Sequence, residues 1–396
     1  MRTPKTVDVF MGTRPEAIKM APVVAALKRQ GGVRCRVVGT GQHREMFHQV
    51  AGELGFTVDV DLDTMQANQT LAGLTARLMQ KIDAWLEGSH PDLALVQGDT
   101  TTVFVAALAC FYRRIPIGHV EAGLRTPSIL SPFPEELNRR LASRMVSLHF
   151  APTRSAQAAL LREGVAEDTI EVTGNTVVDT LFLELARQTA PGGRASIEAA
   201  LSAAIAPDWA TRPFVLITGH RRESFGDGFE QICRAIRTLA LRYPEYRFVY
   251  PVHLNPNVQR PVNRLLNGVA NITLIAPQGY RNFVALMNRC KLILTDSGGV
   301  QEEAPSLGKP VLVMRETTER PEGVEAGTAL LVGAAETSIV ENTSRLLDDS
   351  RSYDAMANAV NPYGDGHAAE RIVARIGRFL ALPGAREPAQ ACSSTS

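Results

Sequence analysis

The fold is decided by residues 6–19, TVDVFMGTRPEAIK, in which an apolar run ends at Gly12 and a helix start follows at once. Thr13 and Glu16 have the T-x-x-E spacing of a capping box, and Pro15 suits the first turn of a helix. We therefore expect a β-strand that leads through a short turn into the N-terminus of a helix.

The same rhythm of short apolar runs and longer helical patterns continues along the chain. The runs lie at residues 6–12, 35–39, 93–97, 116–120 and 170–173, and again at 214–218, 247–252, 272–276, 292–295 and 311–314. This alternation predicts parallel sheets with helices on both faces. A segment rich in Ala, Pro and Gly, around residues 188–212, separates the two series. The predicted fold class is α/β, with two doubly wound Rossmann-like domains facing a central cleft.

Length supports two domains, because 396 residues exceed the roughly 250–300 at which a single core stops growing. We expect an N-terminal domain at residues 1–178, completed by a C-terminal helix at 367–382 with Ile372, Ile376 and Phe379 in its apolar stripe. The C-terminal domain spans residues 179–366. Residues 383–396 are small and polar, and we expect a disordered tail.

Net charge and the length of the apolar runs argue against binding to nucleic acid or to membranes. A formal net charge of +1 argues against nucleic acid and against anionic membrane surfaces, which require an excess of Lys and Arg. Most of the basic pairs at residues 113–114, 139–140 and 221–222 are expected to face solvent or a ligand. The longest apolar run, residues 103–111, is too short to span a bilayer, and no leader precedes the first strand, so we expect neither secretion nor membrane insertion.

Cysteine usage indicates a reducing compartment. The five cysteines form no C-x-x-C pair, and most lie in apolar or helical stretches where a buried thiol is usual. We therefore expect a cytoplasmic protein without disulfide bonds.

Two strand-to-helix turns are candidate anion sites, because ligands of open α/β sheets bind beyond the carboxyl ends of the strands. At residues 12–19, a helix N-terminus is combined with Arg14 and Lys19, which favours an anion, although an ordinary capped helix has the same pattern. At residues 295–299, TDSGG, the glycines would let backbone approach a phosphate.

Three carboxylates, Asp99, Glu121 and Glu135, follow strands or begin a helix in the first half. Grouped carboxylates can divide acid and base roles, because like charges move their pKa values apart. Each could instead cap a helix or complement its dipole. In the second half, His220 ends a strand and titrates near neutrality, which suits proton transfer to a leaving group, and His253 is a weaker candidate.

Several cofactor motifs are missing from the sequence. It contains no G-x-x-x-x-G-K-[ST] loop, no H-E-x-x-H and no complete G-x-G-x-x-G fingerprint. We therefore predict no bound metal, no tightly held NAD and no other cofactor.

Five stretches, at residues 12–19, 98–102, 118–126, 219–224 and 296–303, closely resemble those of the non-hydrolysing UDP-N-acetylglucosamine 2-epimerases. The resemblance spans roughly residues 7–380. It implies a fold like that of GT-B glycosyltransferases and reversible inversion at C2 between UDP-N-acetylglucosamine and UDP-N-acetylmannosamine. In this reaction UDP leaves to give 2-acetamidoglucal and then adds back. The resemblance also implies a homodimer that supplies precursors for cell-surface polysaccharide.

The resemblance assigns roles to individual residues. It implies that Asp99, Glu121, Glu135 and His220 are catalytic. It implies that UDP is bound by Arg14, Lys19, Ser297, Gly298, Gly299, Glu303 and Arg320. Gln42, Arg221 and His253 resemble residues that line a second UDP-N-acetylglucosamine site, which activates many bacterial relatives. Glu45 and Asn68 depart from the pattern of that site.

Three alternatives remain open at this point. A 2-epimerase for a 2,3-diacetamido or uronic UDP-sugar would use much of the same UDP-binding apparatus. A GT-B glycosyltransferase would share the architecture but would require an acceptor. A nucleotide-sugar sensor would bind its ligand and leave it chemically unchanged.

Overall fold

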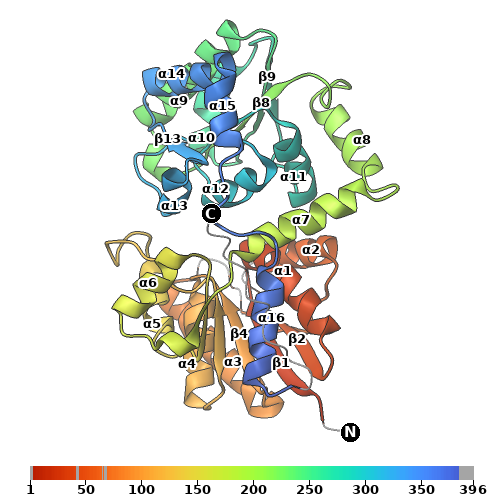
Figure 1. Ribbon diagram of the computed structural model, residues 1–396, viewed down its shortest axis with the longest axis vertical. Coiled ribbons are helices and arrows are strands. Elements are labelled where there is room, and N and C mark those ends of the chain that lie inside the picture. The colour runs from red at the N-terminus through yellow and green to blue at the C-terminus, as the bar shows by residue number, and fades with distance from the viewer. Residues whose placement is uncertain (1–2, 42–43, 65, 67–68, 383–396) are drawn as a thin grey trace, which may run out of the picture. The chain divides into compact units, whose positions relative to one another are not determined.

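The computed structural model describes residues 3–41, 44–64, 66 and 69–382 (Figure 1). The chain divides into two compact units. The first contains the residues up to Thr180 together with those from Gly364 onward, and the second contains Leu181–Tyr363. Gln42, Asn68 and the predicted tail at residues 383–396 lie outside the described residues.

The first unit is built on a seven-stranded parallel sheet in the order β3-β2-β1-β4-β5-β6-β7. The strands are β1 (Lys5–Met11), β2 (Val33–Gly39), β3 (Val60–Asp61), β4 (Leu93–Gln97), β5 (Ile117–Val120), β6 (Leu148–Ala151) and β7 (Ile170–Val172). The connecting helices are α1 (Arg14–Arg29), α2 (Arg44–Leu54), α3 (Leu71–Ser89), α4 (Thr101–Tyr112), α5 (Glu135–Ala142), α6 (Arg154–Arg162) and the short η1 (Glu167–Thr169). Helix α7 (Thr176–Thr189) carries the chain into the second unit.

The second unit has a six-stranded parallel sheet in the order β10-β9-β8-β11-β12-β13. The strands are β8 (Phe214–Thr218), β9 (Arg247–Pro251), β10 (Ile272–Ile275), β11 (Ile293–Thr295), β12 (Val311–Val313) and β13 (Ala329–Leu331). The helices are α8 (Ala195–Ala204), η2 (Arg222–Ser224), α9 (Asp227–Arg242), α10 (Pro256–Leu266), α11 (Tyr280–Arg289), α12 (Gly298–Glu303), η3 (Ala304–Leu307), α13 (Pro321–Glu325), α14 (Glu336–Asp348) and α15 (Ser350–Ala357).

These two doubly wound sheets confirm the predicted fold class of two Rossmann-like units. In each sheet, the strand order reverses between the first and the fourth strand, at β1 and β4 in one and at β8 and β11 in the other. Loops that leave the carboxyl ends of those strands lie next to each other, which is the position where open α/β sheets bind ligands.

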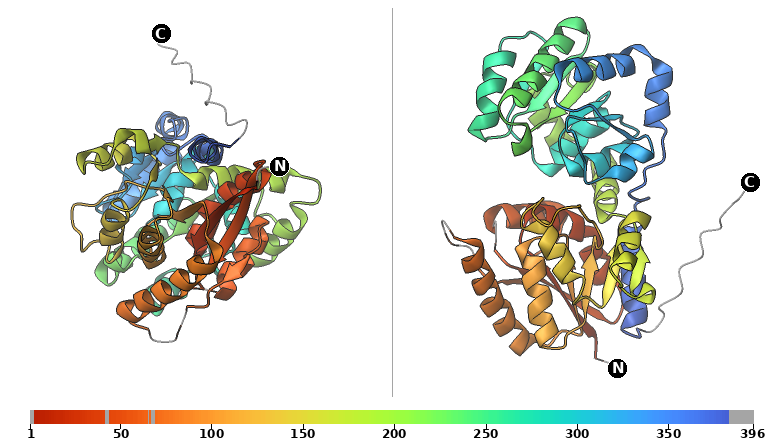
Figure 2. Two further views of the ribbon diagram at one scale, coloured as in Figure 1. Left: turned by 90° about the horizontal axis from the view of Figure 1, so that it is seen from below. Right: turned by 90° about the vertical axis from the view of Figure 1, so that its left-hand side faces the viewer.

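Helix α16 (Ala368–Phe379) returns the chain to the first unit and packs against α1 (Figures 1 and 2). Ile372 and Ile376 of the predicted stripe are buried, but Phe379 is 38% exposed, so its place in the stripe is wrong. Phe379 is the last residue of the helix, where packing against the core ends. The Asp179 carboxylate accepts the backbone N–H groups of Ala368 (3.2 Å) and Ala369 (2.8 Å) and thereby holds the start of the helix.

Arginines on a second face of α16 bind the edge of the first sheet. Arg371 donates to the carbonyl of Thr173 at 3.0 Å, and Arg378 donates to the Glu171 carboxylate at 3.0 Å. Polar contacts therefore reinforce the apolar packing of this helix.

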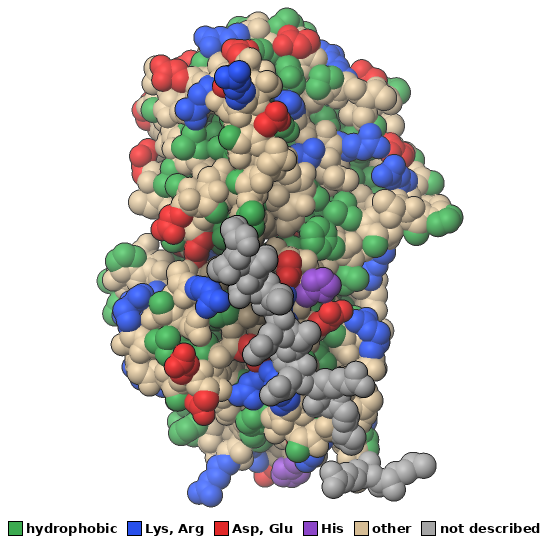
Figure 3. All heavy atoms as spheres, viewed as in Figure 1, with side chains coloured by type: hydrophobic (Ala, Val, Ile, Leu, Met, Phe, Trp, Pro, Cys, Tyr) green, Lys and Arg blue, Asp and Glu red, His purple; other side chains and the backbone are tan. Residues whose placement is uncertain are grey.

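The surface carries charges of both signs (Figure 3), and the described cysteines form no disulfide bonds. On the face drawn in Figure 3, Lys and Arg side chains lie among Asp and Glu side chains. The cysteines at positions 35, 110, 233 and 290 are free thiols. Within the described ranges, no helix is both long and apolar enough to cross a membrane.

Candidate functional site

Glu121 follows β5 directly and is the most constrained carboxylate of the first unit. Its residue is 9% exposed, and its backbone has a φ of 66°, a left-handed conformation that costs a non-glycine residue about 1–3 kcal/mol. Lys19 Nζ and Asn175 Nδ2 (3.1 Å) donate to Oε1, and Gln97 Nε2 donates to Oε2. A strained backbone and several convergent donors are typical of a functional carboxylate.

The donors come from different parts of the same sheet edge. Gln97 is the last residue of β4 and pairs with the last residue of β5, whereas Asn175 follows β7. Lys19 lies in the second turn of α1, after the loop that leaves β1. The structure therefore brings the predicted residues Lys19 and Glu121 together and adds two amides that the sequence analysis missed.

Glu16 ties the two loops at the strand-order reversal of the first unit. Its Oε2 accepts the backbone N–H groups of Gly12 and Thr13, both at 2.8 Å, which is the Glu16 half of the predicted capping box. Its Oε1 accepts from the Thr100 hydroxyl, which follows β4, at 2.6 Å. Burial raises the pKa of Glu16, while these hydrogen bonds act in the opposite direction.

Asp99 lies between β4 and α4, and Arg139 holds its carboxylate. Arg139 Nη2 and Nε donate to Oδ2 of Asp99 at 2.6 and 3.0 Å. Arg139 also donates to the buried Glu136 at 3.1 Å. Arg139 is therefore an exception among the basic pairs, because Glu136 of the same helix and Asp99 of the loop after β4 hold its guanidinium in a buried position.

Glu135 is the first residue of α5 and is half-buried. The loop before it contains two cis peptide bonds, Ser131-Pro132 and Phe133-Pro134. Arg14 is the first residue of α1 and is also half-buried. Both side chains thus remain partly accessible at the carboxyl edge of the sheet.

In the second unit, Asp296 joins the loops at the strand-order reversal. It follows β11, and its Oδ2 accepts the backbone N–H groups of His220 (2.6 Å) and Arg221 (2.7 Å), which follow β8. Its Oδ1 lies 3.4 Å from Nδ1 of the His220 ring. Burial is the largest cause that lowers the pKa of His220, and the charge of Asp296 opposes this shift.

The ring of His220 also stacks on that of His253, with 5.2 Å between ring centroids and 15° between planes. Arg221 is adjacent in sequence, and its backbone is anchored by Asp296. Two of the three residues assigned by resemblance to an activator site, Arg221 and His253, therefore lie close to His220, and the third, Gln42, is outside the described residues.

The side chain of Arg320 lies close to the backbone at Gly298 in the second unit. A Cβ atom at Gly298 would lie 3.1 Å from the central guanidinium carbon of Arg320, so a side chain there would push the arginine away. Arg320 Nε donates to the buried Glu302 at 2.9 Å. The predicted residues Gly298 and Arg320 are thus brought together.

Three further predicted residues belong to the same turn and to the helix α12 that follows it. Ser297 is the N-cap of α12, its backbone N–H donates to the Thr295 hydroxyl at 3.0 Å, and Gly299 follows in the helix. Glu303 is buried and accepts from the Tyr280 hydroxyl at 2.7 Å. Tyr280 was missed by the sequence analysis because no local motif marks it.

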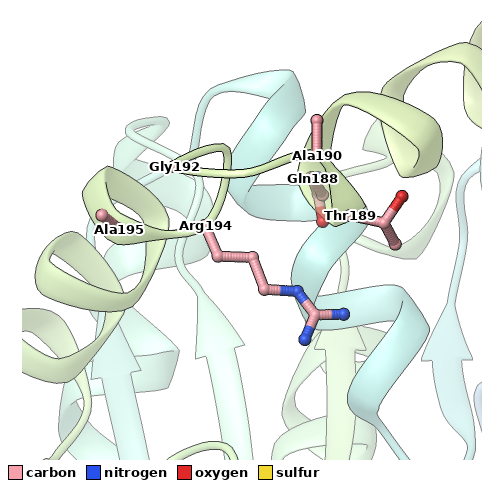
Figure 4. Close-up of a pocket in the computed structure, with 6 residues that line it drawn as sticks. All are labelled: Gln188, Thr189, Ala190, Gly192, Arg194 and Ala195. Carbon is pink, nitrogen blue, oxygen red and sulfur yellow. The ribbon is translucent and has the colours of Figure 1, made fainter.

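One pocket lies elsewhere in the second unit, in the turn between α7 and α8 (Figure 4). Its volume is about 360 Å³. It is lined by Gln188, Thr189, Ala190, Gly192, Arg194 and Ala195, none of which was predicted as a site residue. The part of the chain that the structure describes contains no group of three or more His, Cys, Asp or Glu residues able to hold a metal ion.

Known proteins are similar to this chain in sequence and in fold. A family model described as UDP-N-acetylglucosamine 2-epimerase matches residues 25–377. The UDP-N-acetylglucosamine 2-epimerase of Yersinia pestis is 54% identical over 370 residues, covering 93% of this chain and 97% of the relative. That of Escherichia coli (strain K12) is 52% identical over 369 residues, with coverage of 93% and 97%. The crystal structure of UDP-GlcNAc 2-epimerase from Neisseria meningitidis bound to UDP-GlcNAc has a TM-score of 0.87 and 47% identity, covering 94% of this chain and 100% of the other. The chain therefore belongs to the UDP-N-acetylglucosamine 2-epimerase family of enzymes.

Proposed function

We propose that this enzyme interconverts UDP-N-acetylglucosamine and UDP-N-acetylmannosamine without hydrolysing them, by elimination of UDP and its re-addition to 2-acetamidoglucal. The observation that carries the proposal is Glu121, a carboxylate in strained backbone that Lys19, Gln97 and Asn175 hold in place. The Neisseria meningitidis relative was crystallised with UDP-GlcNAc, which supports the choice of substrate.

The reaction requires a group that accepts the C2 proton and groups that bind the departing diphosphate. The C2 proton of the sugar is too weakly acidic for simple removal and return. Departure of UDP from C1 assists its loss, because the electron pair of the C2–H bond forms the C1–C2 double bond. UDP then adds back after C2 is reprotonated on the opposite face, which inverts this centre.

We assign the proton transfers at C2 to Asp99, Glu121 and Glu135 of the first unit. General acid–base groups contribute about 10²–10⁴-fold to such steps. Arg139 fixes the carboxylate of Asp99 by two hydrogen bonds to one oxygen, which leaves Oδ1 as the oxygen that Arg139 does not bond. Preorganised carboxylates of this kind need little rearrangement when the proton moves.

We assign the binding of UDP to residues Arg14, Lys19, Ser297, Gly298, Gly299, Glu303 and Arg320, with His220 next to the departing diphosphate. Cations and exposed backbone N–H groups stabilise the charge that develops on the leaving oxygen. The half-buried Arg14 and the Arg320 guanidinium, which donates to Glu302, would supply such charge within their own units.

The resemblance to the non-hydrolysing epimerases also suggests how the enzyme is regulated and how it assembles. We propose that a second UDP-N-acetylglucosamine binds at Gln42, Arg221 and His253 and activates the enzyme, that two copies form a homodimer, and that the product supplies polysaccharide synthesis. Hyperbolic initial rates, together with a reverse reaction that needs no added UDP-N-acetylglucosamine, would contradict the activator site.

Incubation in D2O tests the reaction itself. The purified enzyme and UDP-N-acetylglucosamine, without metal or nicotinamide, should give the manno epimer with deuterium at C2 in NMR spectra. Substrate that remains unchanged while UDP binding is demonstrated would contradict the proposal. Parallel assays with 2,3-diacetamido and uronic UDP-sugars, and with candidate acceptors, separate the alternative epimerase from a transferase.

A further inference from the structure

Asp296 is a buried carboxylate with only one of its two oxygens engaged. Oδ2 accepts two backbone N–H groups from the loop that carries His220, at 2.6 and 2.7 Å. Oδ1 is buried and accepts no hydrogen bond from any residue the structure describes. Leaving such an acceptor unsatisfied costs about 1–3 kcal/mol, so a donor at this oxygen would be favoured.

The nearest ring nitrogen is Nδ1 of His220, at 3.4 Å from Oδ1. This distance exceeds the usual 2.7–3.2 Å of an N–H···O bond by a few tenths of an ångström. The His220 side chain is 41% exposed, which leaves room for a small rotation, whereas Asp296 is 1% exposed and anchored by its other oxygen. The histidine, rather than the aspartate, is therefore the partner able to close the gap.

We propose that Asp296 is the positioning residue of His220. Its Oδ1 accepts the Nδ1–H of the imidazole, which fixes the orientation and the tautomer of the ring and leaves Nε2 as the nitrogen that meets the substrate. The inference rests on the proposed function for the identity of that substrate, a UDP-sugar. The hydrogen bond itself stands on the geometry of β8 and β11, whose ends adjoin through the pair Thr218 and Thr295.

This tautomer determines what His220 can do in the reaction. With Nδ1–H bound to a carboxylate, Nε2 is an acceptor in the neutral ring and a donor in the charged ring. As the C1–O bond breaks, its electron pair leaves with the diphosphate oxygen, and the Nε2 proton of charged His220 moves to that oxygen. When the bond re-forms, the proton returns to Nε2, so each turnover restores the starting state.

Three groups face the His220 ring and set its charge. Arg221 and the stacked His253 disfavour protonation, as does burial, and the charge of Asp296 favours it. Asp296 is therefore the one member of this set whose charge favours the protonated ring. Its removal should lower the pKa of His220.

The Asp296→Asn variant separates positioning from simple loop anchoring. The amide oxygen can still accept the two backbone N–H groups, whereas the amide NH2 would face Nδ1 as a donor. The neutral ring should then carry its proton on Nε2, and its pKa should fall, because the opposite charge that favours the protonated ring has been removed. We also expect kcat to fall about 10–100-fold, with KM for UDP-N-acetylglucosamine changed less than about 3-fold.

Asp179→Asn is the matched control. Asp179 is also a buried carboxylate that accepts two backbone N–H groups, but these belong to the start of α16. This variant undergoes the same chemical change, and it should leave the tautomer and the pKa of His220 as they are in the wild type.

The experiment is NMR titration of the full chain labelled with ¹⁵N in its histidines, with His220 assigned by comparison with His220→Gln. An Nδ1–H tautomer in the wild type, shifted to Nε2–H in Asp296→Asn, is the expected result. An Nε2–H tautomer in the wild type, or the same tautomer and pKa in both proteins, would overturn the proposal. The wild-type measurement holds even if Asp296→Asn does not fold. The ring is observed without turnover, so a failure of the hydrogen bond is distinguishable from a failure of the epimerase assay.

Discussion

In both sheets a carboxylate connects the two loops at the strand-order reversal, but the two carboxylates use their oxygens differently. In the first unit, Glu16 reaches back from α1, and both of its oxygens accept hydrogen bonds from the loops after β1 and β4. In the second unit, Asp296 comes from the loop after β11 and accepts bonds from the loop after β8 with only one oxygen. A carboxylate thus ties the two loops together in each unit.

The two carboxylates differ in whether an oxygen remains without a hydrogen-bond donor. Glu16 is saturated with donors, so it can stabilise its loops but has no free oxygen with which to influence a neighbour. Asp296 keeps one oxygen beside a histidine that titrates. Similar topology therefore carries a structural carboxylate in one unit and, in the other, the carboxylate that we propose positions His220.

The largest effect is expected from Glu121→Gln, which removes a proton acceptor from the first unit. We expect kcat to fall about 10²–10⁴-fold, because general acid–base groups contribute this much. Calorimetric binding of UDP should change much less than kcat, since Lys19 is the proposed UDP-binding residue that donates to Glu121 and those of the second unit are untouched. Glu171→Gln, a partly buried glutamate of the same unit that pairs with Arg378, should keep wild-type rates. Retention of full activity by Glu121→Gln would contradict the division of roles between the units.

A smaller effect, on stability rather than rate, is expected from Glu16→Gln. The variant keeps one acceptor oxygen but loses the charge that strengthens the bonds from Gly12, Thr13 and Thr100, so we expect about 1–3 kcal/mol of destabilisation. Urea unfolding of this variant and of Asp296→Asn sharpens the comparison. The contrast between the carboxylates would fail if Glu16→Gln lost its rate while keeping its stability.

The next effect is a pH dependence that differs in sign between the units. Burial raises the pKa of Asp179 to about 6, so the stability contributed by its protonated form is complete below the unfolded value of about 3.8 and is lost as pH rises through about 6. Asp179→Asn stays neutral. Its melting temperature, relative to that of the wild type, should therefore be higher at about pH 7.5 than at about pH 4.5.

Glu319 of the second unit should behave in the opposite way. Burial opposes its ionisation, but hydrogen bonds and charge from Arg315 lower its pKa to about 2. The stability it contributes is present above the unfolded value of about 4.5 and is lost as pH falls through about 2. The melting-temperature deficit of Glu319→Gln should shrink on acidification, and a deficit that grows would contradict this sign.

The smallest effect is expected from substitutions on the apolar surface of the first unit, and it concerns the assembly of the protein rather than its rate. Leu137 and Leu141 lie one turn apart on α5 and are 39% and 41% exposed, and α5 packs against α4, where Phe111 and Tyr112 are also exposed. If a second copy covers this face, Leu137→Ser with Leu141→Ser should shift the mass measured by light scattering from dimer to monomer. Leu241→Ser, an exposed leucine of the second unit, is the control. An unchanged mass would place the dimer contact elsewhere.

Most strands could be predicted from the sequence because buried parallel strands are continuous apolar runs. The three that were missed have physical reasons. β3 has only two residues, β6 contains the buried His149, and β13 has three residues between Gly327 and Gly333. Each is too short or too interrupted to produce a pattern. These segments become strands because each pairs with a neighbouring strand of its sheet, and such pairing is not visible in the local sequence.

The site was predictable only in part, for a related reason. Motifs that follow strands mark Glu121, Asp99 and His220, because parallel strands deliver their ends to one edge of the sheet. Gln97 and Asn175 were missed, since they reach Glu121 from β4 and from beyond β7, and spacing along the chain does not encode that approach. Asp296 was noted as part of a phosphate-binding turn, but its contact with His220 depends on the pairing of β8 with β11.

The return of α16 to the first unit has a consequence for how a cell makes this protein. The ribosome synthesises residues 181–363 before Ala368–Phe379, although this last helix packs on α1, near the beginning of the chain. Residues 181–363 are therefore synthesised while the surface of α1 that α16 will cover is still bare. Nascent chains stalled shortly before residue 368 should therefore bind chaperones through the early unit, and release of the last helix should end that dependence.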